Sequence, residues 1–194
     1  MLKINRLKIS IMAANKEYSF DETFNSGLNF VASDDNTKGK SSVLIAIYYC
    51  LGFEEIIGGV NEKVLTSAYK TMIEDDKSIW PVLESGVFLE VSNGVEEITI
   101  YRSAKSDTRD TLALLQTSEK QIGNHPGVLI FDEPTQHSIG AEDANAFFKS
   151  IIALGNKCQV IVGITVNNAD IKNVISNLEP ERYKYIHIGE KAFV

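Results

Sequence analysis

The sequence predicts an α/β domain, in which a mostly parallel core sheet is flanked by helices and preceded by an antiparallel β subdomain. Two unbroken apolar runs, 128–131 and 160–164, are separated by a helical pattern at 141–154, which is typical of parallel strands buried on both faces. Residues 2–12 and 18–24 instead alternate apolar and polar side chains, which indicates an antiparallel pair of strands. A length of 194 residues with 44% hydrophobic side chains supplies one substantial core.

The remaining elements are predicted from shorter patterns. Asn93-Gly94 lies between two alternating runs and is the preferred sequence of a tight hairpin turn, so residues 87–102 are expected to form a β-hairpin. Residues 53–81 carry no pattern that assigns them. A buried strand at 27–33 and helices at 41–51 and 112–122 complete the prediction.

Charge and cysteine content restrict the function classes. A net charge of -7 and a pI near 5.0 argue against a surface covered with phosphate contacts, so a nucleic-acid surface would be local. Cys50 and Cys158 lie far apart without a C-x-x-C motif, so neither a disulfide framework nor a structural zinc site is indicated, and a reducing cytoplasm fits best. No run approaches the roughly 18 apolar residues of a membrane helix, so no membrane is expected as a partner.

Residues 33–42, S-D-D-N-T-K-G-K-S-S, match the second half of the phosphate-binding pattern G-x-x-x-x-G-K-[ST]. Asp34 replaces the first glycine, and aspartate is among the residues that best tolerate the backbone shape glycine adopts there. The preceding strand and following helix supply the setting that such a loop needs. In that setting Lys40 would reach the outer phosphates and Ser41 would bind Mg²⁺.

A second motif, GVLIFDEPT at 127–135, predicts a buried strand with two carboxylates at its carboxyl end, where ligands of parallel sheets collect. Asp132 would hold Mg²⁺, and Glu133 would orient or deprotonate the attacking water. A GKS or a DE by itself is more often a chance match or a solvated turn. Together the two motifs predict a site for ATP and Mg²⁺ with Glu133 as its catalytic residue.

Asn36 three residues before Gly39, the GKSS tetrad and LIFDEPT together resemble the ATP-binding heads of ABC-type ATPases, specifically the SMC, RecN and RecF group. The resemblance implies an ABC-type P-loop NTPase fold and ATP hydrolysis. It also implies a homodimer of heads that forms on ATP and acts on DNA in repair or anti-phage defence, beside a nuclease or another subunit. The implied nucleotide contacts come from the loop, from Ser106 in a signature segment and from Thr165 at the switch position; the loop residues are Asn36, Thr37, Lys38, Gly39, Lys40, Ser41 and Ser42.

Besides Asp34 in the loop, the chain departs from this family pattern in four places. Glycines are missing after Ser106, no glutamine precedes Gln116, and Thr165 stands where the family often carries a switch histidine. The hairpin also runs into the signature segment without a coiled coil. We interpret residues 1–194 as a single head domain from which a coiled coil was excised near 103–106, leaving lobes 1–103 and 106–194. A naturally short insert is the alternative.

Two other functions remain open. One is a nucleotide-gated binding scaffold with little turnover, favoured by the missing signature glycines and disfavoured by Glu133. The other is the ATPase subunit of an ABC transporter, although such subunits usually carry an intact signature and a switch histidine.

Overall fold

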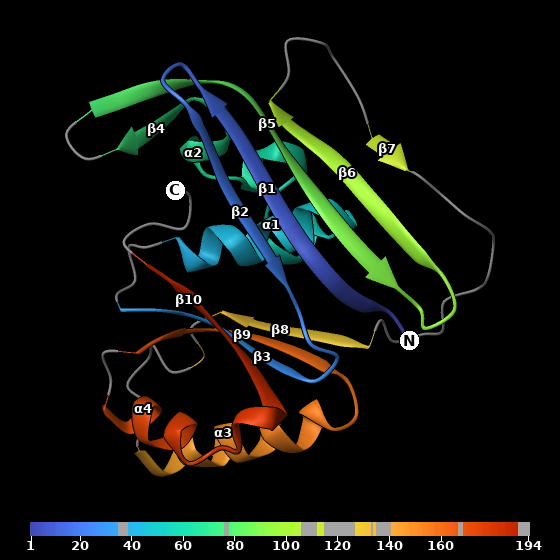
Figure 1. Cartoon of the computed structure of the whole chain (residues 1–194), viewed down its shortest axis with the longest axis vertical. Helices are drawn as coiled ribbons and strands as arrows, with labels where there is room; N and C mark the ends of the chain where they lie inside the picture. The colour runs from blue at the N-terminus through green and yellow to red at the C-terminus, as the bar shows by residue number, and fades with distance from the viewer. Residues whose placement is uncertain are drawn as a thin grey trace.

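The computed structural model of the chain describes residues 1–34, 39–75, 78–105, 112–114, 127–132, 134, 141–166 and 169–189. Its strands form two sheets that lie on either side of one helix (Figure 1). The antiparallel sheet has the order β2-β1-β5-β6-β7, with β4 paired to β5, and the parallel sheet has the order β10-β3-β9-β8.

The antiparallel sheet confirms the expected N-terminal pair and the hairpin. β1 and β2 pair with Ile9 opposite Phe20, and β5 pairs with β1 on its other side with Val87 opposite Ile9. The turn at Gly94 has a φ of 91°, which glycine adopts without steric cost. The strands are β1 (Lys3–Ala13), β2 (Glu17–Thr23), β4 (Met72–Asp75), β5 (Ser78–Ser92), β6 (Glu97–Lys105) and β7 (Leu112–Leu114).

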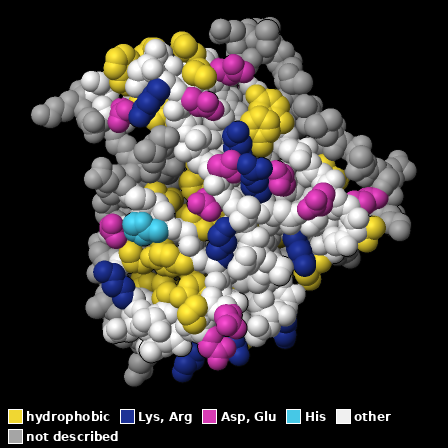
Figure 2. Space-filling model, viewed as in Figure 1, with side chains coloured by type: hydrophobic (Ala, Val, Ile, Leu, Met, Phe, Trp, Pro, Cys, Tyr) yellow, Lys and Arg dark blue, Asp and Glu magenta, His cyan; other side chains and the backbone are white. Residues whose placement is uncertain are grey.

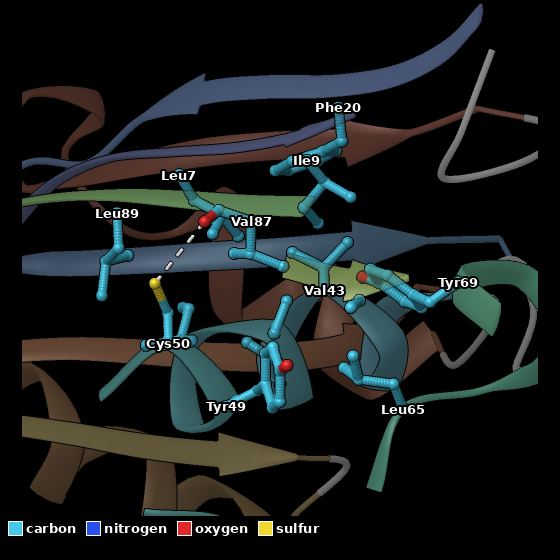
Figure 3. Packing of buried hydrophobic residues seen from close by; sticks show 14 of the residues in the cluster. Leu7, Ile9, Phe20, Val43, Tyr49, Cys50, Leu65, Tyr69, Val87 and Leu89 are labelled. Carbon is cyan, nitrogen blue, oxygen red and sulfur yellow. Dashed lines mark hydrogen bonds between the residues drawn. The ribbon is translucent and has the colours of Figure 1, made fainter. Parts of the chain in front are cut away.

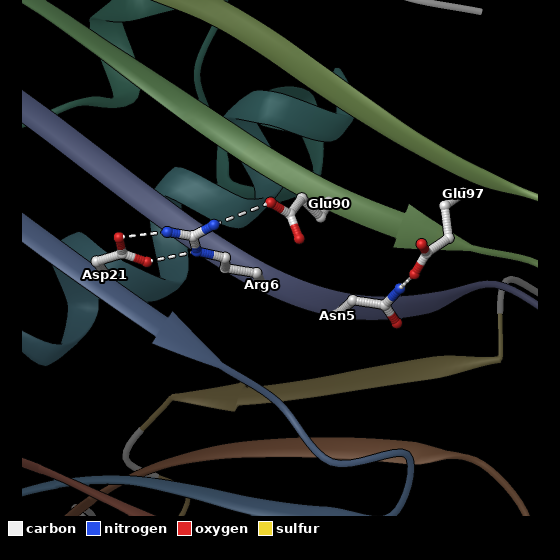
Figure 4. Close-up of polar contacts among 5 residues, drawn as sticks. All are labelled: Asn5, Arg6, Asp21, Glu90 and Glu97. Atoms are coloured by element: carbon white, nitrogen blue, oxygen red, sulfur yellow. Dashed lines mark hydrogen bonds and ion pairs between the residues drawn. The ribbon is translucent and has the colours of Figure 1, made fainter. Parts of the chain in front are cut away.

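The outer face of this sheet carries a group of polar contacts, drawn in Figure 4. Arg6 of β1 donates from Nε and Nη2 to the Asp21 carboxylate of β2, both at 2.6 Å, and contacts Glu90 of β5 at 3.2 Å. Leu7 and Ile9 alternate with these polar residues and are fully buried on the opposite face. Such exposed ion pairs contribute little stability, so they mainly keep this face soluble in water while the inner face packs.

The parallel sheet confirms the expected strand, helix, strand unit. β8 and β9 are parallel, with Leu129 opposite Val160, and α3 connects them. All six residues of β3 are buried. One face of this sheet packs on α1, and the other packs on α3 and α4. The elements are β3 (Leu28–Ser33), α1 (Lys40–Leu51), β8 (Val128–Asp132), α3 (Ala141–Gly155), β9 (Gln159–Thr165), α4 (Ala169–Ser176) and β10 (Tyr183–Ile188).

The expected ABC-type P-loop NTPase fold, built on a mostly parallel core sheet with a small antiparallel subdomain, is wrong. In the described residues the larger sheet has six strands and is antiparallel, and the parallel strands form a separate sheet of four. The physical reason is the length of β5, which pairs along both β1 and β6 and so joins the N-terminal pair and the hairpin into one sheet. The inner face of that sheet forms one wall of the core that contains α1.

Helix α1 fills the space between the two sheets. Val43 and Cys50 of α1 face Leu7, Val87 and Leu89 of the antiparallel sheet (Figure 3), and all five are buried. Burying each of the valine and leucine side chains stabilises the fold by about 1.5–3 kcal/mol. The close packing fixes the position of the whole helix, including its first residues.

The other predictions have mixed outcomes. Residues 53–81, which carried no clear pattern, form short elements: η1 (Glu54–Ile57), η2 (Asn61–Val64), α2 (Ser67–Lys70) and β4, while η3 (Pro180–Arg182) precedes β10. The helix expected at 112–122 is wrong at its start, because residues 112–114 pair with β6 as β7, and residues 115–122 lie outside the described part of the chain. Of the described helices, none is long and apolar enough to cross a membrane.

Candidate functional site

The candidate site lies where β3 ends and α1 begins. Gly39 precedes the helix with φ 92° and ψ 17°, a left-handed conformation that favours glycine. Its carbonyl oxygen accepts the first hydrogen bond of the helix from the Val43 N–H group at 3.1 Å. The first amide groups of an α-helix have no partner within the helix, and its dipole attracts anions to this end. The start of α1 therefore provides the local chemistry of a phosphate site.

Lys40 is the most deeply buried charged residue of this site, with a relative exposure of 2%. Its Nζ donates hydrogen bonds to Ser33 Oγ and Thr165 Oγ1, each at 2.9 Å. Ser33 and Thr165 are register partners at the carboxyl ends of β3 and β9, so the sheet itself brings the two hydroxyls together. Hydroxyl oxygens are neutral acceptors, and an ammonium group bonds more strongly to anionic oxygens.

Asp132 ends β8 at the same edge of the parallel sheet, opposite Gly163 of β9. A Cβ atom built on Gly163 would lie 3.0 Å from Asp132 Oδ1 and 2.8 Å from Leu44 Cδ1 of α1. The carboxylate therefore lies over the glycine, toward α1. Burial, and after it the charge of Asp132, raise the pKa of Tyr48 on α1.

The structure thus brings together part of the predicted site. Lys40 and Thr165 are in direct contact, and Asp132 lies at the same sheet edge. Ser41 is exposed, while the main-chain oxygen of Ser42 accepts a hydrogen bond from the Tyr69 hydroxyl at 3.0 Å. The other predicted site residues lie outside the described residues: Asn36, Thr37, Lys38, Ser106 and Glu133.

Two residues of the site were missed from the sequence. Ser33 accepts a hydrogen bond from Lys40, and Gly163 makes room for the Asp132 carboxylate. Ser33 could have been found, because it ends the strand that leads into the GKS loop and is a small polar residue in an apolar run. Gly163 could not have been found from the sequence, because it makes room for Asp132 only through the pairing of β8 with β9.

Ser41 and Asp132, the residues predicted to hold Mg²⁺, both lie in the described part of the chain, where no group of three or more His, Cys, Asp or Glu side chains is arranged to hold a metal ion. The Ser41 hydroxyl and the Asp132 carboxylate are the hard oxygen donors that this cation prefers.

A search of protein-family models and a search of curated proteins each found no match to this chain. The interpretation of the site therefore depends on its own geometry and motifs.

Proposed function

We propose that the chain binds ATP with Mg²⁺ at the start of α1 and hydrolyses it to ADP and phosphate. The observation that supports this most directly is the buried Lys40, which is held by two hydroxyls at the carboxyl edge of a parallel sheet and directly follows a left-handed glycine. A buried ammonium group at a helix N-terminus is suited to the outer phosphates of a nucleotide. Ligands of open α/β sheets also collect at this edge.

The chain's own residues have distinct roles in this proposal. Lys40 neutralises charge on the phosphates, and Thr165 holds the lysine in place and would offer its hydroxyl to the terminal phosphate. Ser41 and Asp132 would hold Mg²⁺, which would neutralise phosphate charge when bound. Glu133, assigned from the sequence, takes the proton of the attacking water; the new bond from water to the γ-phosphorus forms as the bond to the bridging oxygen of ADP breaks.

The resemblance of residues 33–42 and 128–135 to SMC-like heads supports a wider proposal. In it the chain is a cytoplasmic ATPase head that pairs with a second copy on ATP and acts on DNA, in repair or defence, through arms absent from this chain. Light scattering of Glu133→Gln with ATP tests the pairing, because slowed hydrolysis should accumulate the dimer. A Glu133→Gln variant that stays monomeric at saturating ATP would contradict pairing by the isolated chain.

Calorimetry with ATP and Mg²⁺ on the wild type, Lys40→Met and Lys149→Met tests the binding step. Methionine keeps an unbranched side chain that is one atom shorter and removes the charge, and Lys149 is an exposed lysine on α3 that serves as the matched control. Lys40→Met should weaken binding by about 10-fold to 100-fold, the range expected for a charge-assisted hydrogen bond, whereas Lys149→Met should not. Absence of ATP binding by the folded wild type would overturn the proposal. Binding without turnover would instead assign the nucleotide-gated scaffold.

A further inference from the structure

A cavity of about 490 Å³ lies between β10 and α4, beside the carboxyl end of β3. In Figure 2 the cyan histidine side chain lies next to an acidic side chain and above a hydrophobic patch on this face. The walls combine apolar Val166 and Ile175 with the polar side chains of Lys172 and Ser176. Cavities that bind small organic ligands have this size and this mixture of apolar walls with a few polar groups.

One wall of the cavity is aromatic. Tyr185 and His187 are two residues apart on β10, so both point to the same face of the sheet. Their rings are nearly parallel, at an interplanar angle of 14° and with centroids 6.3 Å apart. His187 Nε2 lies 3.5 Å from Asp34 Oδ1, which ties this wall to the residue that follows β3. Tyr185 is 40% exposed, so part of its ring is open to a ligand.

The cavity and the buried lysine are on opposite faces of the same sheet edge. Ser33 and Thr165 accept hydrogen bonds from Lys40, and the residues that follow them, Asp34 and Val166, line the cavity. Because successive residues of a strand point to opposite faces, Ser33 and Thr165 face the lysine while Asp34 and Val166 face the cavity. A ligand that binds at both places has to pass over the ends of β3 and β9.

We propose that this cavity binds the base and ribose of the nucleotide whose phosphates bind at the start of α1. The inference rests on the proposed function and extends it by naming the base subsite. Tyr185 and His187 provide the stacking surface for the base, while Ser176, Lys172 and Asp34 offer hydrogen-bond donors and an acceptor for its edge or for the ribose. Aromatic stacking accepts every base, so these polar groups would determine which base is preferred.

Calorimetry with ATP and with inorganic tripolyphosphate, each with Mg²⁺, separates the two subsites. Tyr185→Ala should weaken ATP binding by about 10-fold and leave tripolyphosphate binding unchanged, because stacking of one base contributes on this scale. Tyr185→Phe retains the ring and should bind ATP like the wild type. Phe53→Ala is the matched control, since Phe53 is 41% exposed and lies far along the chain in the loop after α1.

The outcomes are distinguishable. If tripolyphosphate binds the wild type but Tyr185→Ala leaves ATP affinity unchanged, the base subsite is refuted while the phosphate site stands. If Tyr185→Ala weakens ATP and tripolyphosphate equally, the side chain acts on the phosphate site or the fold, and the inference is again wrong. If neither ligand binds the folded wild type, the proposed function and this inference both fail.

Discussion

The carboxylate of Asp132 lies over Gly163, the residue opposite it on the neighbouring strand. A Cβ atom on Gly163 would be only 3.0 Å from Asp132 Oδ1 and 2.8 Å from Leu44 Cδ1, both closer than normal contact. The missing side chain is therefore what lets a carboxylate lie between the sheet edge and α1. A candidate Mg²⁺ ligand and the packing of the helix depend on the same position.

Gly163→Ala should consequently disturb both the site and the fold. The new methyl group forces Leu44 and Asp132 to move, which should lower the free energy of unfolding by about 1–3 kcal/mol, as overpacking generally does. If the proposed function holds, ATP turnover should fall by at least about 10-fold because the carboxylate is displaced. Urea unfolding and phosphate release measure the two effects.

Gly189→Ala is the matched control for that substitution. No atom lies within 4 Å of a Cβ built on Gly189, and its φ is outside the left-handed region. Its stability should change by less than about 0.5 kcal/mol. Equal stability and turnover for Gly163→Ala and the wild type would show that the Asp132 carboxylate does not need this space.

Thr165→Val tests the hydroxyl that holds Lys40. Valine has nearly the same shape but lacks the oxygen that accepts the 2.9 Å hydrogen bond from Nζ. The free energy of unfolding should fall by about 1–3 kcal/mol, since a buried charged donor loses one acceptor. Thr165→Ser keeps the hydroxyl and should retain most of this stability. Chemical unfolding of both variants measures the difference, and a Thr165→Val variant as stable as the wild type would show that the hydroxyl does not support Lys40.

Most of the local structure could be predicted from the sequence, whereas the way the parts join could not. The N-terminal pair, the hairpin and the strand, helix, strand unit follow from alternation and from apolar runs, which are local properties. The pairing of β5 with β1, with Lys3 opposite Ser92, has no local signal, and it is this pairing that joins the two antiparallel pairs into the larger sheet. The sequence likewise predicted Lys40 and Asp132 as site residues, but not that Ser33 contacts Lys40 or that Gly163 leaves space for Asp132.

Gln159→Leu tests a side chain that holds the two sheets together. The buried Gln159 amide accepts from the Ile4 N–H group and donates to the Ile4 carbonyl, each at 2.7 Å, and also donates to the Asn25 carbonyl at 2.9 Å. It thereby joins the start of β9 to β1. Leucine leaves these main-chain groups without their partner, so stability should fall by about 2–4 kcal/mol. A loss below about 1 kcal/mol in urea unfolding would mean that water or other groups replace the amide.

The ion pair between Arg102 and Glu54 predicts a pH dependence of stability. Glu54 is 7% exposed in its side chain, and Arg102 Nη2 contacts its carboxylate at 2.5 Å. Burial tends to raise the pKa of Glu54, but the hydrogen bond and charge of Arg102 outweigh it and hold this pKa below its ordinary value of 4.5. Because the folded-state pKa is the lower one, the contribution is fully present above the unfolded-state pKa and is lost as pH falls through the folded-state value.

Glu54→Gln should therefore be less stable than the wild type at pH 7, by about 1–3 kcal/mol, because Arg102 loses its anionic partner. The difference should shrink as the pH falls below about 4.5, because the wild-type carboxyl becomes neutral there as well. Urea unfolding of both proteins across this range measures it. Glu55→Gln is the control, since the Glu55 side chain is exposed on the same short helix and should show no such convergence. A wild-type advantage that stays constant down to pH 3 would show that Glu54 stabilises the fold through its shape and not through its charge.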